Sequence, residues 1–262
     1  MHEWLHDGPI VGMVHLPALP GAPRYGGDRR AVRERALADA RALESGGVDA
    51  VMVENFGDAP FHPADVPKHV VAEMTAHVGA VRGAIDLPVC VNVLRNDAAA
   101  ALSVAAATGA DAIRVNVHSG ARLTDQGIVE GRAHETLRLR ERLDRDVAIL
   151  ADVAVKHSAP LAPEDLAAET RDAVERGLAD GVIASGGGTG RPVDDERLRT
   201  VAAVAEEHGV PAFVGSGATA DTVADLLAVA DGVVVGSALK AGDAADPVDE
   251  GRVRALVEAA GR

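Results

Sequence analysis

Eight short, almost uninterrupted apolar runs recur along this chain of 262 residues, and they limit its fold more than any other feature. Each run is followed by Gly, Asn or Asp and then by a segment with the period of an amphipathic helix. Continuous apolar character indicates strands buried on both faces, as in a parallel sheet. A spacing of roughly 20–40 residues suits one strand plus one crossover helix. The runs are Pro9–Leu16, Ala50–Asn55, Pro88–Val93, Ala112–Val117, Val147–Val155, Gly181–Ser185, Pro211–Val214 and Gly232–Gly236.

Glycines mark the ends of the helices that we expect between these runs. A Gly just past the last turn supplies the left-handed conformation that ends many helices. The expected helices are Asp28–Glu44, Ala98–Thr108, Pro163–Arg176 and Asp194–His208, followed by Gly46-Gly47, Gly109, Gly177 and Gly209. Eight repeated strand–helix units without a linker predict a single (β/α)₈ TIM barrel domain over residues 1–262. An open doubly wound sheet is the competing architecture, but it normally has fewer strands.

The charge balance narrows the partners that we expect. Forty acidic residues against 26 basic ones give a net charge of −14, and only three of the basic residues are lysines. This composition is typical of salt adaptation, and it provides no basic stripe for nucleic acid. The sequence contains no signal-peptide pattern and no apolar stretch of membrane-spanning length, so we expect a cytoplasmic protein without membrane insertion. The single cysteine, Cys90, lies in an apolar run and is expected to be a buried thiol.

Three glycine-rich turns follow the last three runs and predict a phosphate site. Turns without side chains let backbone N–H groups converge on an anion, and barrels often bind phosphate after strands seven and eight. The alternative is that the glycines only form tight turns. The segment Gly215–Ala220 also fits a dinucleotide-binding pattern, but its position after the seventh run does not suit that fold. The expected phosphate-binding residues are Gly187, Gly188, Thr189, Gly215, Ser216, Gly217, Gly236 and Ser237.

Polar side chains near the ends of five runs are the candidate catalytic residues, because a buried strand should otherwise be apolar. Long loops at Pro17–Asp28, Phe56–His69 and His118–Glu130 follow three of these runs, where barrels carry their chemistry. Within one run, Arg114, Asn116 and His118 alternate at period two and are expected to point the same way. The catalytic or orienting candidates are His15, Glu54, Asn92, Arg114, Asn116, Asp152 and Lys156.

Several of these candidates have competing interpretations. Asp152 would have a raised pKa among apolar side chains, and could then carry a proton, unless Arg114 pairs with it and makes it a fixed ion. Lys156 could form an imine if desolvation lowers its pKa, although we expect it at the rim. A divalent metal site could be built from His15, Glu54, Asp152 and His157, but no close-spaced ligand motif supports it. Each polar residue could also be an ordinary hydrogen-bonded wall residue.

The chain also resembles the BtpA/SgcQ family nearly from end to end. The resemblance lies in Gly12–Gly27 (GMVHLPALPGAPRYGG), Val53–Phe61 (VENFGDAPF), Arg114–Val117 (RVNV) and Asp152–His157 (DVAVKH). It implies a barrel of the ribulose-phosphate-binding type. It also implies one of two roles, a factor in photosystem I or membrane-complex biogenesis, or an enzyme acting on a sugar phosphate.

The residues favour an enzyme acting on a small phosphorylated sugar or related metabolite. Isomerisation, epimerisation and aldol-type cleavage all move a proton beside a carbonyl, and carboxylates, an imidazole and orienting amides suit each of them. The alternative is a non-catalytic assembly factor that binds a protein partner through the barrel exterior. No exposed aromatic anchors mark such a face. We further expect a homo-oligomer, which is common among barrels of this kind.

Overall fold

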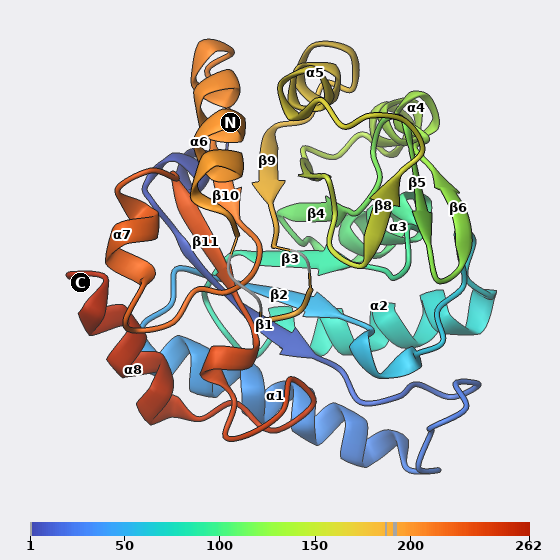
Figure 1. Ribbon diagram of the computed structural model, residues 1–262. Coiled ribbons are helices and arrows are strands. Elements are labelled where there is room, and N and C mark those ends of the chain that lie inside the picture. Colours follow the sequence, from blue (N-terminus) through green and yellow to red (C-terminus); the bar gives the residue numbers. More distant parts are fainter. Residues whose placement is uncertain (1, 187, 191–192) are drawn as a thin grey trace.

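The eight predicted runs form a closed parallel barrel in the computed structural model, which describes residues 2–186, 188–190 and 193–262 (Figure 1). Strand β1 pairs with β2 on one side and with β11 on the other, so the barrel is closed and the open sheet is excluded. Around the barrel the strands are β1 (Ile10–His15), β11 (Gly232–Val235), β10 (Ala212–Val214), β9 (Gly181–Ala184), β7 (Ala148–Val153), β4 (Ala112–Val115), β3 (Val89–Asn92) and β2 (Ala50–Glu54).

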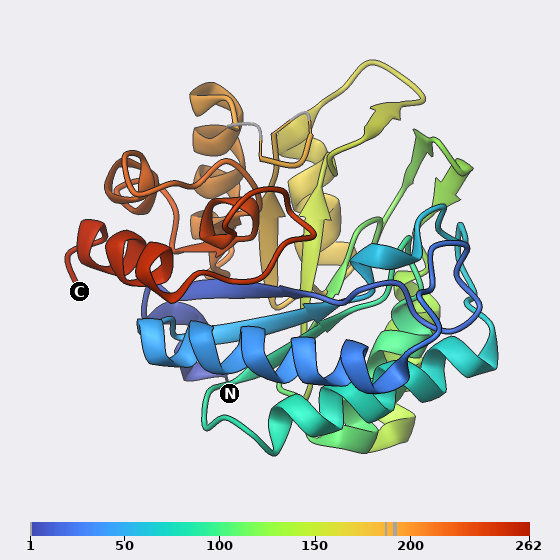
Figure 2. The same cartoon turned by 90° about the horizontal axis from the view of Figure 1, so that it is seen from below.

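The helices surround the barrel, and Figure 2 shows α1 and α2 side by side along one flank. They are α1 (Arg29–Gly46), α2 (Lys68–Arg82), α3 (Ala98–Thr108), α4 (Ala133–Leu143), α5 (Leu166–Arg171), α6 (Asp195–Glu207), α7 (Val223–Leu227) and α8 (Glu250–Ala259). Short 3₁₀ turns are η1 (Glu3–His6), η2 (Phe56–Asp58) and η4 (Ser237–Leu239). A π-helical turn, η3 (Asp172–Arg176), continues α5.

Most of the expected helix ends are observed, with one exception. Gly47, Gly109 and Gly209 adopt positive φ angles at or just beyond the ends of α1, α3 and α6. Gly177 has a φ of −82°, and the left-handed residue is Leu178 instead, at 50°. The helix therefore ends at Arg176 as predicted, but the left-handed conformation predicted for Gly177 was wrong. The helix ends in a π-helical turn, which displaces the chain reversal by one residue.

The apolar interior occupies only the lower part of the barrel, at the N-terminal ends of the strands. Leu5 of η1 closes this end from outside the sheet and packs with residues that point inward. The interior cluster comprises Leu5, Val11, Met13, Ala50, Met52, Cys90, Ala112, Ala148, Leu150, Ile183, Phe213 and Val234. Cys90 is fully buried, as predicted, and burial raises the pKa of its thiol. A larger apolar layer lies between the strands and the helices.

A second, three-stranded antiparallel sheet extends beyond the barrel mouth. It contains β6 (Gly127–Glu130), β5 (Ala121–Thr124) and β8 (Ser158–Pro160), in that order, and Figure 1 shows it beside β4. The sequence predicted only a long loop at His118–Glu130. The hairpin was missed because its strands are four residues long and its faces are largely exposed, so they lack a buried strand's pattern.

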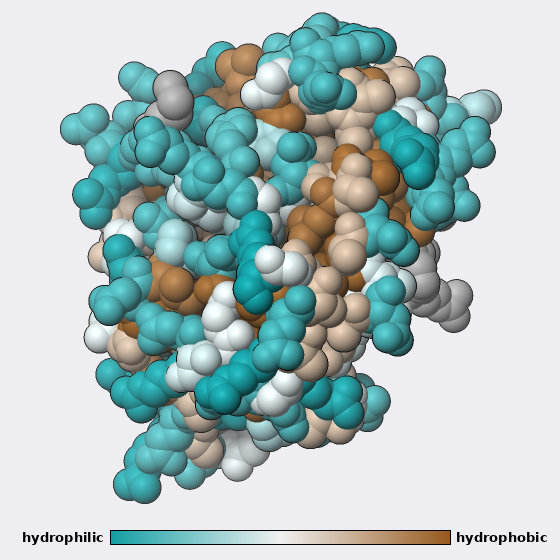
Figure 3. Space-filling model, turned by 90° about the vertical axis from the view of Figure 1, so that its left-hand side faces the viewer, coloured by the Kyte–Doolittle hydropathy of each residue, from teal (hydrophilic) through white to brown (hydrophobic). Residues whose placement is uncertain are grey.

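Figure 3 shows the surface over α6, α7 and α8, the left-hand side of the molecule in Figure 1. Hydrophilic residues cover most of this face, and hydrophobic residues form a narrower band between them. Among the described residues, no helix combines the length and the apolar character needed to cross a bilayer.

Candidate ligand-binding site at the barrel mouth

A layer of polar side chains fills the barrel above the apolar cluster. His15, Glu54, Asn92 and Arg114 are register partners on β1, β2, β3 and β4, so they lie at one level of the sheet. All four are at least nine-tenths buried. Buried polar groups must find hydrogen-bond partners. Their contacts therefore define how the mouth is organised.

Asp152 of β7 is a fixed ion within this layer. Its Oδ1 and Oδ2 accept hydrogen bonds from Nη2 and Nε of Arg114, at 2.7 and 2.9 Å. Nδ2 of Asn116 donates a third hydrogen bond to Oδ2, at 2.7 Å. Arg114 therefore pairs with Asp152, the second of the two interpretations given above. A carboxylate bound on both oxygens by a permanently charged guanidinium is suited to holding its partners in place.

Glu54 and His15 are neighbours with different partners. Oε2 of Glu54 accepts a hydrogen bond from Nδ2 of Asn92 at 2.6 Å, and Oε1 lies 3.8 Å from Nε2 of His15. Burial lowers the pKa of His15 to about 4, against the raising influence of Glu54. The imidazole is therefore neutral at pH 7, and the contact at 3.8 Å is not a salt bridge. Phe56 stacks on the ring with centroids 4.4 Å apart and holds its orientation.

The tautomer of His15 follows from its second contact. Nδ1 lies 2.8 Å from the carbonyl oxygen of Ala244. A carbonyl can only accept, so in the neutral ring Nδ1 carries the proton and Nε2 carries the lone pair. Nε2 is thus a free proton acceptor on the side of Glu54, which is the form that a general base requires.

The glycine-rich turns after β9, β10 and β11 meet at a narrow cavity. Its volume is about 20 Å³, and Thr189, Gly190, Gly215, Ser216, Gly217, Gly236 and Ser237 line it together with His15, Arg114 and Lys156. The backbone amides of Gly217, Ala218 and Ser237 donate no hydrogen bond to a described residue. Gly188 does not line this cavity, and Gly187 lies outside the described residues.

Two glycines bring these turns against the polar layer. A Cβ atom on Gly236 would lie 3.0 Å from Cε1 of His15, and one on Gly215 would lie 2.5 Å from Oγ of Ser185 and 3.3 Å from Nη2 of Arg114. Side chains at either position would push the turn away from the imidazole or the guanidinium. Glycine is therefore required here for close approach and not only for turning the chain.

A wide cavity of about 420 Å³ opens beside the narrow one. His15, Lys156 and Thr189 line both cavities, so the two meet at these residues. The remaining lining residues are Arg24, Glu54, Phe56, Ala59, Phe61, Leu94, Arg95, Asn116, Asp125 and His157. Two buried polar atoms among them, Nε of Arg95 and Oδ1 of Asn116, have no hydrogen-bond partner within the described residues.

Lys156 stands where the two cavities meet. Its side chain makes no hydrogen bond or ion pair with a described residue. Burial is the main cause that lowers its pKa to about 8, and the neighbouring Arg114 lowers it further. The sequence placed this lysine at the rim, whereas it is partly buried and faces the interior of the mouth.

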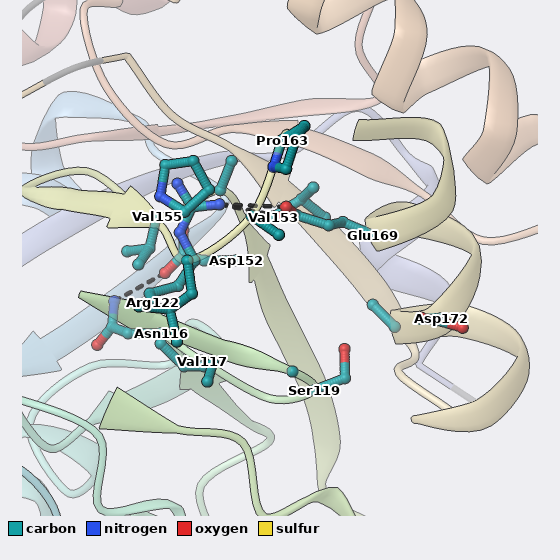
Figure 4. Close-up of a pocket in the computed structure, with 17 residues that line it drawn as sticks. Asn116, Val117, Ser119, Arg122, Asp152, Val153, Val155, Pro163, Glu169 and Asp172 are labelled. Atoms are coloured by element: carbon teal, nitrogen blue, oxygen red, sulfur yellow. Dashed lines mark hydrogen bonds and ion pairs between the residues drawn. The ribbon is translucent and has the colours of Figure 1, made fainter. Parts of the chain in front are cut away.

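A third cavity, of about 260 Å³, lies between the mouth and the antiparallel sheet (Figure 4). Figure 4 shows Asp152 and Asn116 joined on one side and Arg122 joined to Glu169 on the other. Arg122 also bonds Glu164 at 3.1 Å and Ser158 at 3.1 Å. These contacts tie β5 to β8 and to α5. The sequence did not predict this cavity, whose walls come from the ends of β4 and β7, the segments that follow them, and α5.

Two sequence hypotheses are not supported by the geometry. The described residues contain no group of three or more His, Cys, Asp or Glu side chains arranged to bind a metal ion, so the proposed metal site gains no support. His118 was expected to point the same way as Arg114 and Asn116. Instead its Nε2 donates to the carbonyl oxygen of Gly177 at 2.8 Å, because β4 ends at Val115 and the alternation stops there.

The structure also adds residues that the sequence analysis did not single out. Arg24 and Arg95 line the wide cavity, and Nη2 of Arg95 donates to the carbonyl oxygen of Lys156 at 2.6 Å. Arg24 lies within the Gly12–Gly27 motif, which carried the resemblance and could have drawn attention to it. Arg95 follows β3 by three residues, and nothing in its local sequence separates it from a surface arginine.

The fold is a (β/α)₈ barrel whose mouth holds a glycine-lined cavity bordered by Arg114 and Lys156. The chain belongs to the BtpA family, whose model matches residues 6–262. It is 49% identical to the Photosystem I biogenesis protein BtpA of Synechocystis sp., over 96% of this chain and 87% of that protein. It is also 49% identical to an uncharacterised protein of Thermococcus kodakarensis, over 96% and 95% of the two chains.

Solved structures confirm the fold class. Thiamine phosphate pyrophosphorylase from Pyrococcus furiosus superposes with a TM-score of 0.61 at 16% identity, covering 98% of both chains. N-(5'-phosphoribosyl)anthranilate isomerase from the same organism gives 0.59 at 17% identity, covering 97% of this chain and 98% of that one. At this identity the likeness concerns the barrel alone.

Proposed function

We propose that this protein is an enzyme that binds a small phosphorylated metabolite at the barrel mouth and moves a proton beside its carbonyl group. The phosphoryl group would occupy the narrow cavity between the glycine turns. The carbon chain would extend past His15 and Lys156 into the wide cavity. The narrow cavity now has room for little more than one water molecule, so phosphoryl binding requires the surrounding turns to separate.

The observation that carries the proposal is the gathering of unpaired polar groups around the two cavities. Three residues that line the narrow cavity have backbone amides without a partner among the described residues. Arg24, Arg95 and Lys156 line one cavity or the other, against the two acids Glu54 and Asp125, and the charge of Arg114 is paired with that of Asp152. A cationic mouth in a chain of net charge −14 would attract and hold an anion.

The proposed proton transfer assigns different roles to the buried polar residues. Nε2 of His15 is an unprotonated acceptor, and the Glu54 carboxylate lies 3.8 Å away and faces the wide cavity. Either group could take a proton from carbon, and the other could return it. Asp152 would act through Arg114 and Asn116, by holding them towards the substrate. Oδ1 of Asn116 would accept a hydrogen bond from a hydroxyl group of the substrate.

Binding of phosphorylated sugars is the first test. We expect ribulose 5-phosphate and ribose 5-phosphate to raise the melting temperature, and ribose and ribulose to leave it unchanged. A ligand at 100 times its Kd stabilises the folded protein by about 2.7 kcal/mol, a shift that is easily measured. Absence of stabilisation by any phosphorylated sugar at saturating concentration would contradict the proposal.

A charge introduced at the narrow cavity tests whether the phosphoryl group binds there, and the same change on the protein surface is the matched control. Ser237→Asp places a carboxylate among the turns and should weaken binding of the phosphorylated sugars by more than about tenfold, through repulsion. Ser45→Asp makes the same change on exposed α1 and should leave binding unaltered. Equal affinities of the two variants would mean that the phosphoryl group binds elsewhere.

The biogenesis role of the Synechocystis relative is the second candidate function, and 49% identity to that protein is the observation in its favour. Glu54→Gln separates the two. An enzyme would lose activity through this change. An assembly factor that uses the barrel exterior would keep its biological role, since Glu54 is buried in the mouth.

A further inference from the structure

The three lysines of the chain occupy three different environments. Lys68 is exposed at the start of α2. Lys240 is fully buried, with Nζ 3.1 Å from the carbonyl oxygen of Met13 and 3.7 Å from Oδ2 of Asp39. Lys156 is the one whose amine borders two cavities without a hydrogen bond or ion pair to a described residue. The amine of Lys240 therefore has partners within the fold, whereas the amine of Lys156 has none among the described residues.

The surroundings of Lys156 do not supply a structural partner. Arg114 and Arg95 are like charges, and the carboxylate of Asp152 is already bound on both oxygens. The remaining acid, Glu54, bonds Asn92 and lies beside His15. An ammonium group held near two guanidinium groups is destabilised relative to the neutral amine. The site therefore raises the fraction of uncharged, nucleophilic amine at the nitrogen that faces the substrate cavity.

We propose that Lys156 is a catalytic nucleophile that forms an imine with the carbonyl group of an aldehyde or ketone bound in the wide cavity. This inference rests on the proposed function for the position of the substrate's phosphoryl group. It narrows that function to carbonyl compounds whose reaction passes through a covalent intermediate.

The covalent step is balanced by groups already in the mouth. Nζ of Lys156 adds to the carbonyl carbon, and the carbonyl electron pair moves to oxygen, which takes up a proton. That hydroxyl takes up a second proton and leaves as water, while the nitrogen lone pair forms the C=N bond. The two protons that oxygen gains are the two that nitrogen loses, and Glu54 or Nε2 of His15 can carry them. Protonation of the imine draws electrons from the neighbouring C–H bond. Glu54 or Nε2 of His15 can then accept that proton. Addition of water reverses the sequence and releases the product.

Reductive trapping tests the inference directly. The full-length protein is incubated with glycolaldehyde phosphate, a small phosphorylated aldehyde, and sodium cyanoborohydride, and the labelled lysine is found by peptide mass spectrometry. We expect Lys156 to be labelled at least about tenfold faster than exposed Lys68, because far more of its amine is neutral at pH 7. Buried Lys240 should remain unlabelled.

The pH profile of labelling separates an active nucleophile from a structural amine. The pKa of Lys156 is lowered to about 8 by burial and by Arg114 and Arg95, against Glu54 and Asp152. Labelling of Lys156 should therefore rise with pH and level off above about 8, whereas Lys68 should go on gaining reactivity. Lys156→Arg keeps a positive charge but cannot form an imine. It should abolish labelling at this position and leave labelling of Lys68 unchanged.

The outcomes distinguish this inference from the proposed function. If phosphorylated sugars stabilise the protein but the label appears on Lys68 alone or on no lysine, the imine is excluded while phosphate binding stands. If unphosphorylated glycolaldehyde labels Lys156 as fast as glycolaldehyde phosphate and no phosphorylated sugar binds, the result supports Lys156 as a nucleophile and contradicts the proposed phosphate site.

Discussion

The two ends of the barrel interior are built from the same strands but have opposite chemistry. At the N-terminal end, residues such as Met52, Leu150 and Phe213 pack around Leu5 with no polar side chain among them. At the C-terminal end, His15, Glu54, Asn92, Arg114 and Asp152 fill the same cylinder with hydrogen bonds and an ion pair. The lower end can therefore supply stability while the upper end is free to bind and react. Substitutions at the lower end should therefore change mainly stability, whereas substitutions at the upper end should also change ligand binding.

The largest effect on stability should come from the lower end. Phe213→Ala removes a fully buried ring from the interior cluster and should lower the free energy of unfolding by about 3–5 kcal/mol. Because Phe213 lines neither the narrow nor the wide cavity, affinity for ribulose 5-phosphate should change less than about twofold, measured by calorimetry below the melting temperature. A large loss of affinity would show that the two ends are not separable.

At the upper end, breaking the ion pair should affect both properties. Arg114→Met leaves Asp152 buried without its guanidinium and should lower the free energy of unfolding by about 3 kcal/mol in urea titration. The same change should abolish ligand binding, because Arg114 lines the narrow cavity. Adding Asp152→Leu should recover most of the stability but none of the binding. Recovery of both would assign the pair a purely structural role.

Acidification should lower the free energy of unfolding through the buried imidazoles, His15 in the mouth first. Burial lowers the pKa of His15 from 6.5 to about 4, so between these values the unfolded chain binds a proton that the folded chain does not. Stability is therefore lost as pH falls from about 6.5 to about 4, by up to about 3 kcal/mol. Burial also lowers the pKa values of His77 and His118, which contribute in the same direction.

The variant His15→Asn shows how much of this pH dependence of stability comes from the imidazole of His15. Its stability, measured by urea titration at several pH values, should fall less steeply over the same range than that of the wild type. Parallel curves would indicate that His15 titrates normally and that its neutral form is not maintained by burial.

The smallest effect should come from one methyl group at the glycine turns. Gly236→Ala brings a Cβ to 3.0 Å from Cε1 of His15, tighter than ordinary contact, and should reduce stability by about 1 kcal/mol and affinity several-fold. Gly79→Ala in the last turn of α2 places its Cβ 3.6 Å from the nearest atom and should be neutral or slightly stabilising. If both variants bind equally well, close approach at Gly236 is not needed for the site.

The sequence predicted the barrel well because each strand carries its own signal. A run such as Gly232–Gly236 is apolar throughout and bounded by turn residues, so its position does not depend on distant contacts. The polar residues at the ends of neighbouring parallel strands were expected to lie close together. The strand register pairs His15 with Glu54 and Asn92 with Arg114. The hairpin β5–β6 was missed because its short, exposed strands lack the pattern of a buried strand. The contacts of Arg95 with Lys156 and of His118 with Gly177 could not be predicted, because they join residues distant in sequence.

The central claim is that backbone amides of the late turns bind a phosphoryl group opposite the buried imidazole and carboxylate. A crystal structure grown with saturating ribulose 5-phosphate tests it most directly. We expect the phosphoryl group between the amides of Gly217 and Ser237, with the carbonyl carbon directed towards Lys156. A phosphoryl group bound outside the mouth, or an empty mouth at saturating ligand, would contradict the claim.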